Sequence, residues 1–411
     1  MLIHNKSLTT TLLFLCVWAF AGDTVRPGLE TIEYTGPNEE ESALINAIQK
    51  PFFEGKDVTA ALQDWFDGRL LDTQNKPEQA RIKWIQGMTK LKDLKPLPET
   101  QWGEWPDAEF QTVAELEIPG YKDVRLQVVG WKVGKLQEYG VMLSPAKPAE
   151  GAKYPLILYC HGAAFGLPES FMNWLARLVR QGYVVIGPAM RGEPLFQWNF
   201  PIKGKELSCE GEIENLEGEI DDCLAMLSAA WKQPFVRPNE FAVIGHSFGA
   251  GVGLVTAARG GNKTKAVVSY DAWLVNPQRY YWDRMRRGPR NWESWEDYCN
   301  QPVYPQLVGL KKRSVIMNAS MMQSPLLLFM GGAYKGSVFH KSHDDFTTEL
   351  TKLGKKFKYH LIPNGDHNFV LRTDSRPVTI ALQIQTAFLN KHFPPFKKQP
   401  LPKENAAENG N

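Results

Sequence analysis

The sequence has little net charge. Its 411 residues include 47 basic and 45 acidic side chains, and a formal charge of +2 argues against a protein that binds nucleic acid through a strong positive field. Internal repeats and low-complexity tracts are also missing. A hydrophobic share of 43% is typical of a globular protein with a large core. We expect disorder only in the polar tail, residues 396–411.

Long hydrophobic runs are missing as well. The apolar stretch near the N-terminus is shorter than the ~20 residues that span a bilayer, so a stable membrane span is not expected. It follows the single charge of Lys6 and ends in the small-x-small pattern Ala19-Phe20-Ala21. These features predict a cleavable signal peptide over residues 1–21 and a secreted or periplasmic protein. A retained anchor and lipidation at Cys16 are the alternatives.

Cysteine is scarce, with five in the whole chain. Removal of the signal peptide would leave Cys160, Cys209, Cys223 and Cys299, which can pair in three ways. Cys209 and Cys223 are close in the chain and are the pair that we expect in a compartment that permits disulfides. Cys160 ends an apolar run and is predicted to be a buried free thiol rather than a nucleophile.

Residues 22–100 have a helical pattern. Apolar side chains follow a period of 3.6 after Asp57, at Val58, Ala61, Leu62, Trp65 and Phe66. Ile82, Ile85 and Met88 repeat the pattern further along the chain. We therefore expect an amphipathic helical N-terminal extension, with these residues on its apolar faces and no catalytic group.

Residues 101–395 read as one catalytic domain of the α/β class. Residues 112–143 alternate between polar and apolar side chains, which predicts antiparallel strands. Solid apolar runs separated by helical stretches follow, at Leu156–Tyr159, Tyr183–Ile186, Phe241–Ile244, Ala266–Val268, Leu326–Phe329 and Phe357–Ile362. Strands that are buried on both faces and alternate with helices predict a mostly parallel, doubly wound sheet.

A Gly-x-Ser-x-Gly pentapeptide, Gly245 to Gly249, lies between a predicted strand and a predicted helix. Such a sharp turn needs glycine on both sides of the serine, and it exposes the serine hydroxyl at the carboxyl end of the sheet. The pattern predicts a nucleophile elbow with Ser247 as the nucleophile. The N–H of Phe248 would then help to hold the oxyanion of the reaction.

A serine nucleophile needs a base, and His367 after the last strand is the best candidate. The other histidines fit less well. His246 lies inside the elbow and is expected to point away from the site, His161 belongs to a loop, and His360 lies within a strand. His161 opens the loop after the first core strand, where a backbone N–H is suitable for an oxyanion hole.

The acid that should orient the base is predicted to be Asp271, directly after a strand. Many enzymes of this kind carry the acid after the next strand, where this chain has no carboxylate. Asp344 and Asp345 are the alternatives, although they are placed to start a helix. His340, His343 and Asp344 could suggest a metal site, but the His-Glu-x-x-His pattern is missing, so no metal is expected.

Residues 273–323 form a long insertion between two core strands, rich in tryptophan, tyrosine and arginine. An insertion at this point overhangs the carboxyl ends of the strands, so we interpret it as a cap over the substrate pocket. Its aromatic side chains could stack on a sugar or an acyl chain. Packing of the cap onto the body of the protein is an equally good interpretation.

The chain resembles the α/β-hydrolase superfamily, in particular its dienelactone hydrolase-like group and the branch of plasma-type platelet-activating-factor acetylhydrolase. The matching segments are Pro155 to Gly162, Ala242 to Gly249, Asp271-Ala272-Trp273, Ser324 to Phe329 and His367-Asn368-Phe369. The resemblance covers residues 154–390 and implies the α/β-hydrolase fold. It implies Asp271 as the acid, and Ala163 and Phe248 as the oxyanion N–H donors. Arg191-Gly192-Glu193 is similar to dienelactone hydrolases and prolyl oligopeptidases.

These observations predict a secreted serine carboxylesterase with the triad Ser247, Asp271 and His367, acting through an acyl-enzyme. The substrate is expected to be a small-molecule, lipid or carbohydrate ester. No cofactor, metal or nucleic acid is expected. A peptidase similar to prolyl oligopeptidase and a non-catalytic binding protein of the same fold are the alternatives.

Overall fold

The computed structural model describes residues 35–98, 101–162, 165–197, 201–273, 275–276, 279, 312–372 and 375–397. The predicted signal peptide, Cys299, most of the predicted cap and most of the C-terminal tail lie outside the described residues. None of the described helices combines the length and the apolar character that crossing a bilayer requires.

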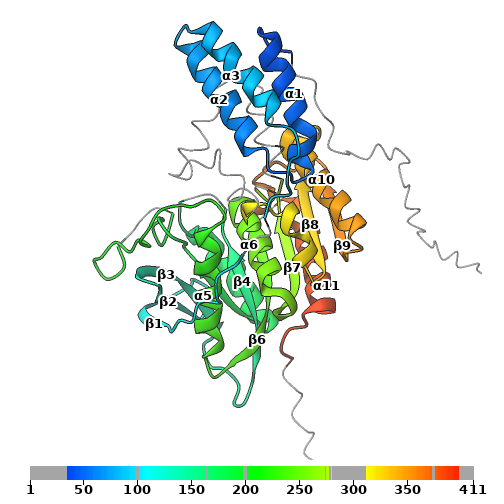
Figure 1. Ribbon diagram of the computed structural model, residues 1–411. Coiled ribbons are helices and arrows are strands. Elements are labelled where there is room, and N and C mark those ends of the chain that lie inside the picture. The colour runs from blue at the N-terminus through cyan, green and yellow to red at the C-terminus, as the bar shows by residue number, and fades with distance from the viewer. Residues whose placement is uncertain are drawn as a thin grey trace, which may run out of the picture.

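The described strands form one nine-stranded sheet in the order β1-β2-β3-β5-β4-β6-β7-β8-β9 (Figure 1). The strands are β1 Gln111–Leu116, β2 Val124–Val133, β3 Leu136–Pro145, β4 Tyr154–Cys160, β5 Val184–Pro188, β6 Val236–His246, β7 Thr264–Tyr270, β8 Leu326–Gly331 and β9 Phe357–Ile362. The pairs β1/β2, β2/β3 and β3/β5 are antiparallel, and the other pairs are parallel. The predicted mostly parallel sheet with antiparallel N-terminal strands is therefore confirmed.

Helices cover both faces of the sheet because successive side chains of the central strands point to opposite faces. On β4, Leu156 and Leu158 belong to the same core as α5 and α6, whereas Ile157 and Tyr159 belong to the core under α4 and α11. The bounds are α4 Met172–Gln181, α5 Gly218–Trp231, α6 Ser247–Gly260, α10 Val338–Lys352 and α11 Arg376–His392. Short 3-10 turns are η1 Glu169–Phe171, η2 Gly261–Lys263, η3 Ile316–Met321, η4 Gly332–Tyr334 and η5 Phe369–Leu371.

Three helices form the N-terminal extension, which confirms the predicted helical pattern: α1 Glu39–Phe53, α2 Thr59–Thr73 and α3 Pro77–Thr89. They lie together at one end of the molecule (Figure 1). The predicted apolar face of α3 is wrong, because Ile82, Ile85 and Met88 are 54%, 47% and 39% exposed. Trp84 is buried instead. Its indole lies so close to Gly68 of α2 that a Cβ there would be 2.2 Å from Nε1, and this close packing turns the isoleucine face to the outside.

The expected disulfide between Cys209 and Cys223 is absent, since both are free and buried, as is Cys160. Their places in the fold explain why. The Cys209 sulfur accepts the backbone N–H of Tyr139 on β3 at 3.2 Å. Cys223, on α5, faces Cys160, and their sulfurs are 3.9 Å apart, about twice the length of a disulfide bond (~2.05 Å). The prediction that Cys160 is a buried free thiol is confirmed.

A buried carboxyl group on β3 should make stability depend on pH. Glu138 is fully buried, and burial, together with the negative charge of Asp222, raises its pKa to about 9. In the unfolded chain a glutamate titrates near pH ~4.3. Between these values the folded protein binds a proton that the unfolded chain has lost, so the free energy of unfolding should fall as pH rises.

Glu138→Gln removes this titration and keeps the shape of the side chain. We therefore expect the variant to gain stability relative to the wild type from about pH 5 to about pH 9. Urea unfolding at several pH values, followed by tryptophan fluorescence, measures the difference. A stability difference that does not change with pH would contradict this expectation.

Candidate active site

The predicted elbow lies where β6 runs directly into α6. Ser247 is the first residue of α6 and has a positive φ of 53°. Its neighbours leave no room for side chains. A Cβ on Gly245 would lie 2.6 Å from the Cα of Ala250, and one on Gly249 would lie 2.1 Å from the carbonyl oxygen of His161. Glycine at both positions therefore allows the strained turn that presents the serine hydroxyl.

The structure brings Ser247 and His367 together. Ser247 Oγ lies 2.7 Å from Nε2 of His367, which follows β9 in the chain. Burial lowers the pKa of His367, against the opposing effect of the Asp366 charge. A neutral imidazole is thus favoured at neutral pH, and its Nε2 can accept the serine proton. This pair can act as a nucleophile and its base.

His246 holds the backbone of that base, a contact that the sequence analysis missed. Its Nε2–H donates to the carbonyl oxygen of His367 at 2.9 Å, and the two rings are 5.3 Å apart. Burial lowers the pKa of His246 to about 4, so it is neutral at physiological pH and can keep this tautomer. Its Nδ1 would lie 2.5 Å from a Cβ on Gly162. The ring therefore fills the space between the His367 loop and the loop that starts at His161.

Asp271 lies at the end of β7, with a positive φ of 46°. One carboxylate oxygen accepts the N–H of Gly331 at 2.7 Å, and the other is buried without a hydrogen-bond partner in the described structure. Burial raises the pKa of Asp271 to about 8. Two residues further on, the N–H of Trp273 donates to the carbonyl oxygen of Ser247 at 2.8 Å. The carboxyl group thus lies at the carboxyl ends of the strands, as Ser247 does, and one of its oxygens is available to an N–H donor.

The alternative acids have other partners. Asp345 is buried and bonds to Arg279 at 2.7 Å and to Asn276 at 2.8 Å. Asp344 lies 3.2 Å from Nδ1 of His340, one turn earlier on α10. In the described structure, Asp344 contacts a residue of α10 itself, and Asp345 bonds to residues that pack against α10.

His340, His343 and Asp344, which could suggest a metal site in the sequence, do not form one in the structure. Nδ1 of His343 donates to the carbonyl oxygen of Phe339 at 3.0 Å. Across the described ranges, no three His, Cys, Asp or Glu side chains gather as metal ligands.

The structure describes one of the two predicted oxyanion donors. Phe248 directly follows Ser247 in the first turn of α6. Ala163 lies outside the described residues. The loop before it passes directly over the nucleophile, because a Cβ on Gly162 would lie 3.1 Å from the Cβ of Ser247.

Glu193 fixes the ends of this loop. The sequence analysis named it only within Arg191-Gly192-Glu193, the segment that is similar to dienelactone hydrolases and prolyl oligopeptidases. Its carboxylate accepts the N–H of Gly166 at 2.7 Å and lies 3.5 Å from Nε2 of His161. That imidazole nitrogen is also 3.0 Å from the carbonyl oxygen of Ala189. Since Glu193 is almost fully buried, these contacts hold both ends of the loop in place without solvent competition.

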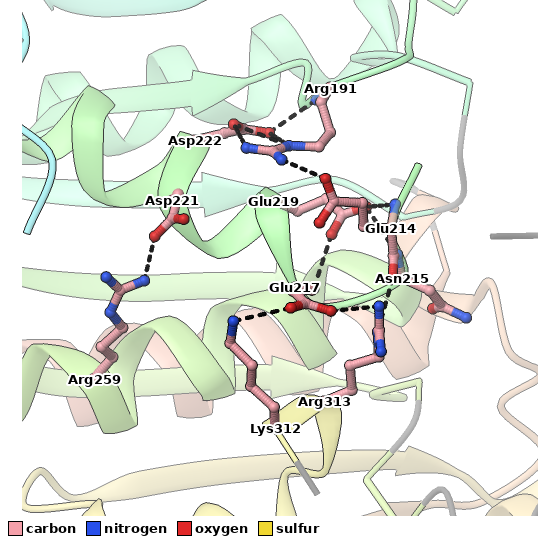
Figure 2. Close-up of polar contacts among 10 residues, drawn as sticks. All are labelled: Arg191, Glu214, Asn215, Glu217, Glu219, Asp221, Asp222, Arg259, Lys312 and Arg313. Carbon is pink, nitrogen blue, oxygen red and sulfur yellow. Dashed lines mark hydrogen bonds and ion pairs between the residues drawn. The ribbon is translucent and has the colours of Figure 1, made fainter. Parts of the chain in front are cut away.

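A network of charged side chains surrounds the start of α5 (Figure 2). Arg191, after β5, pairs with Asp222 of α5 at 2.7 Å and with Glu214 at 2.6 Å. Glu217, just before α5, pairs with Lys312 at 2.9 Å and with Arg313. Lys312 and Arg313 belong to the C-terminal part of the predicted cap, so the network connects that part of the cap with the start of α5.

Comparisons with known proteins agree with this architecture. Residues 169–395 match the profile of the prolyl oligopeptidase family. Over 146 residues the chain is 30% identical to dipeptidyl-peptidase 5 of Porphyromonas gingivalis, covering 34% of this chain and 20% of that one. Over 107 residues it is 29% identical to a Synechocystis sp. protein named as a carboxymethylenebutenolidase, covering 25% of this chain and 43% of that one. The chain thus spans less than half the length of these relatives.

Among solved structures, the fold is similar to that of an acylaminoacyl peptidase from Pyrococcus horikoshii. The TM-score is 0.53 at 17% identity, over 68% of this chain and 44% of the peptidase. This likeness confirms the predicted α/β-hydrolase fold. The finer resemblance to plasma-type platelet-activating-factor acetylhydrolase stays a prediction.

Proposed function

Because the chain belongs to the prolyl oligopeptidase family, we propose that it is a serine hydrolase whose triad is Ser247, His367 and Asp271. The observation that carries this proposal is the 2.7 Å contact between Ser247 Oγ and His367 Nε2 at a nucleophile elbow. A serine hydroxyl in contact with a neutral imidazole is the arrangement that nucleophilic catalysis requires.

In the proposed reaction, Ser247 Oγ attacks the substrate carbonyl carbon while His367 Nε2 takes the hydroxyl proton. The N–H groups of Phe248 and Ala163 hold the oxyanion. His367 returns the proton to the leaving group, and an acyl-enzyme remains. Water then releases the acyl group by the same steps. The ionised carboxylate of Asp271 would accept Nδ1–H of His367 and so stabilise the imidazolium that forms, and the imidazolium charge in turn favours the ionised carboxylate, which exchanges no proton in the reaction.

The proposed substrates are short acyl peptides or similar molecules that carry an amide or ester carbonyl. Membership of a family of peptidases supports cleavage of amides. The likeness to a protein named as a carboxymethylenebutenolidase supports the second candidate, the carboxylesterase that the sequence analysis predicted. Secretion, which rests on residues 1–21, is part of the proposal, and N-terminal sequencing of the mature chain tests it.

Labelling and turnover test the function. We expect a fluorophosphonate probe to label the wild type and not Ser247→Ala, because the probe reacts with an activated serine. Turnover of p-nitrophenyl esters and of aminoacyl p-nitroanilides should likewise disappear in Ser247→Ala. Hydrolysis of the anilides marks a peptidase, and hydrolysis of the esters alone marks an esterase. Equal labelling and turnover by both proteins would refute the proposed nucleophile, and a wild type inert to all three reagents would refute the hydrolase.

A further inference from the structure

We infer that Asn215, in the segment before α5, binds the substrate by recognising a peptide group; the inference rests on the proposed function. Asn215 is fully buried, and in the described structure neither its side-chain nitrogen nor its side-chain oxygen has a hydrogen-bond partner. A buried polar group without a partner destabilises the folded protein, because it has lost its hydrogen bonds to water. Native proteins contain few of them, and each calls for an explanation such as a ligand.

The amide of Asn215 has no structural task in its own turn. Asparagine often adopts a positive φ because its side chain bonds to nearby backbone, yet here other groups hold the turn. Asn215 and Leu216 have φ values of 61° and 70°. Glu219 accepts the backbone N–H groups of Asn215 at 3.0 Å, of Glu214 at 2.8 Å and of Glu217 at 3.1 Å.

Arg313 further fixes this segment, because its guanidinium donates to the carbonyl oxygen of Glu214 at 2.9 Å. Figure 2 shows the Asn215 side chain directed away from the charged network around it. The neighbouring Leu216 is in the left-handed region, which is strained for a leucine because its Cβ approaches the following carbonyl oxygen. Strain of this kind gathers at functional sites, where the surrounding structure fixes a side chain for a ligand.

The segment lies next to the nucleophile. The side chain of Leu216 and the carbonyl oxygen of Trp273 meet at Gly251, where a Cβ would be 3.0 Å and 2.4 Å from them. Gly251 is one helical turn after Ser247, and the N–H of Trp273 bonds to the Ser247 carbonyl. Leu216 therefore packs at the first turn of α6, and Asn215 precedes it in the chain.

The chemistry of the side chain selects the ligand. A carboxamide presents one acceptor and one donor side by side, and a peptide group presents the complementary donor and acceptor. A charged ligand group would leave part of this pair unused in a buried place. The inferred ligand is thus a peptide group in the acyl part of the substrate, next to the carbonyl that Ser247 attacks.

Two esters of the same length separate this role from a structural one: p-nitrophenyl pentanoate and the p-nitrophenyl ester of N-acetylglycine, which differ by a peptide group in the acyl chain. We expect Asn215→Leu to lower kcat/KM for the N-acetylglycine ester roughly tenfold or more. A site that hydrogen-bonds a polar group of its substrate strongly prefers that substrate, and the variant has lost the side chain that makes these bonds. Hydrolysis of the pentanoate should stay within about twofold. The melting temperature should fall no further than in the control variant Asn239→Leu, since both variants carry a leucine at a positive φ and the unpaired buried amide is replaced by an apolar group.

Asn239→Leu is the matched control. Asn239 is exposed, with a φ of 59° at the start of β6, so the variant reports the effect of a left-handed leucine alone. Equal losses on both esters, or no loss on either, overturn the inference while hydrolysis of the pentanoate still supports the proposed function. Ser247-independent hydrolysis of the pentanoate overturns both. If Asn215→Leu does not fold, Asn215→Asp, which lacks the amide donor, should show the same selective loss.

Discussion

Asp271→Asn is expected to lower kcat by about 10⁴-fold, with little change in KM. Asparagine fits the same space and can still accept the N–H of Gly331, which now bonds to the carboxylate at 2.7 Å. Its amide carries no charge, however, and can present N–H instead of an acceptor to Nδ1 of His367. The imidazole would then be held in the wrong tautomer, and the imidazolium of the reaction would lose its stabilising charge.

The measurement is kcat on p-nitrophenyl acetate for purified variants whose circular dichroism matches that of the wild type. Asp344→Asn is the control, because Asp344 contacts His340 on the surface of α10, and its activity should stay near that of the wild type. Asp345→Asn should lower stability rather than kcat, since Asp345 bonds to Arg279 and Asn276. A near-native rate for Asp271→Asn together with a large loss in Asp344→Asn would move the acid to α10.

Arg191→Met should destabilise the protein by ~3–5 kcal/mol, because it leaves a buried carboxylate without its counter-charge. Asp222 is fully buried. It accepts the Arg191 guanidinium at 2.7 Å and the Arg191 backbone N–H at 2.9 Å. Other carboxyl groups are close by, and burial raises the pKa of one of them, Glu219, to about 7. Without the arginine, this acidic cluster has to take up protons or break open.

Urea unfolding of Arg191→Met, of Asp222→Leu, of the double variant and of a surface control tests this role. Arg191→Met/Asp222→Leu should recover most of the lost stability, because an apolar pair of similar volume replaces a buried ion pair at little cost. Arg180→Met is the surface control. Its ion pair with Asp123 is about half exposed, so its loss should cost no more than ~1 kcal/mol. Strictly additive losses in the double variant would show that Arg191 and Asp222 do not depend on each other.

The sequence predicted the features that depend on local pattern. Solid apolar runs identified the central strands, because a strand that is buried on both faces has apolar side chains at successive positions. The elbow was predictable because its glycines are required by contacts within a few residues, such as that of Gly245 with Ala250. The order of Ser247 and His367 along the chain was enough to expect them at the same edge of the sheet.

Features that depend on contacts between distant segments could not be predicted. Periodicity identified α3 as amphipathic, but the close packing of Trp84 on Gly68 decided which face is buried. Nearness in sequence suggested a bond between Cys209 and Cys223, whereas the sheet places Cys160 next to Cys223. The role of His246 depends on a backbone carbonyl 121 residues away, and no signal within the elbow itself could have revealed it.

The strand order also bears on when the contact between Ser247 and His367 can form during synthesis. From β6 to β9, the strands are added to the sheet in the order in which the ribosome makes them. Ser247 therefore emerges 120 residues before His367, which follows the last strand. A nascent or prematurely terminated chain that ends before His367 would carry the proposed nucleophile without its proposed base. The contact on which the proposed activity depends can thus form only after β9 has been made.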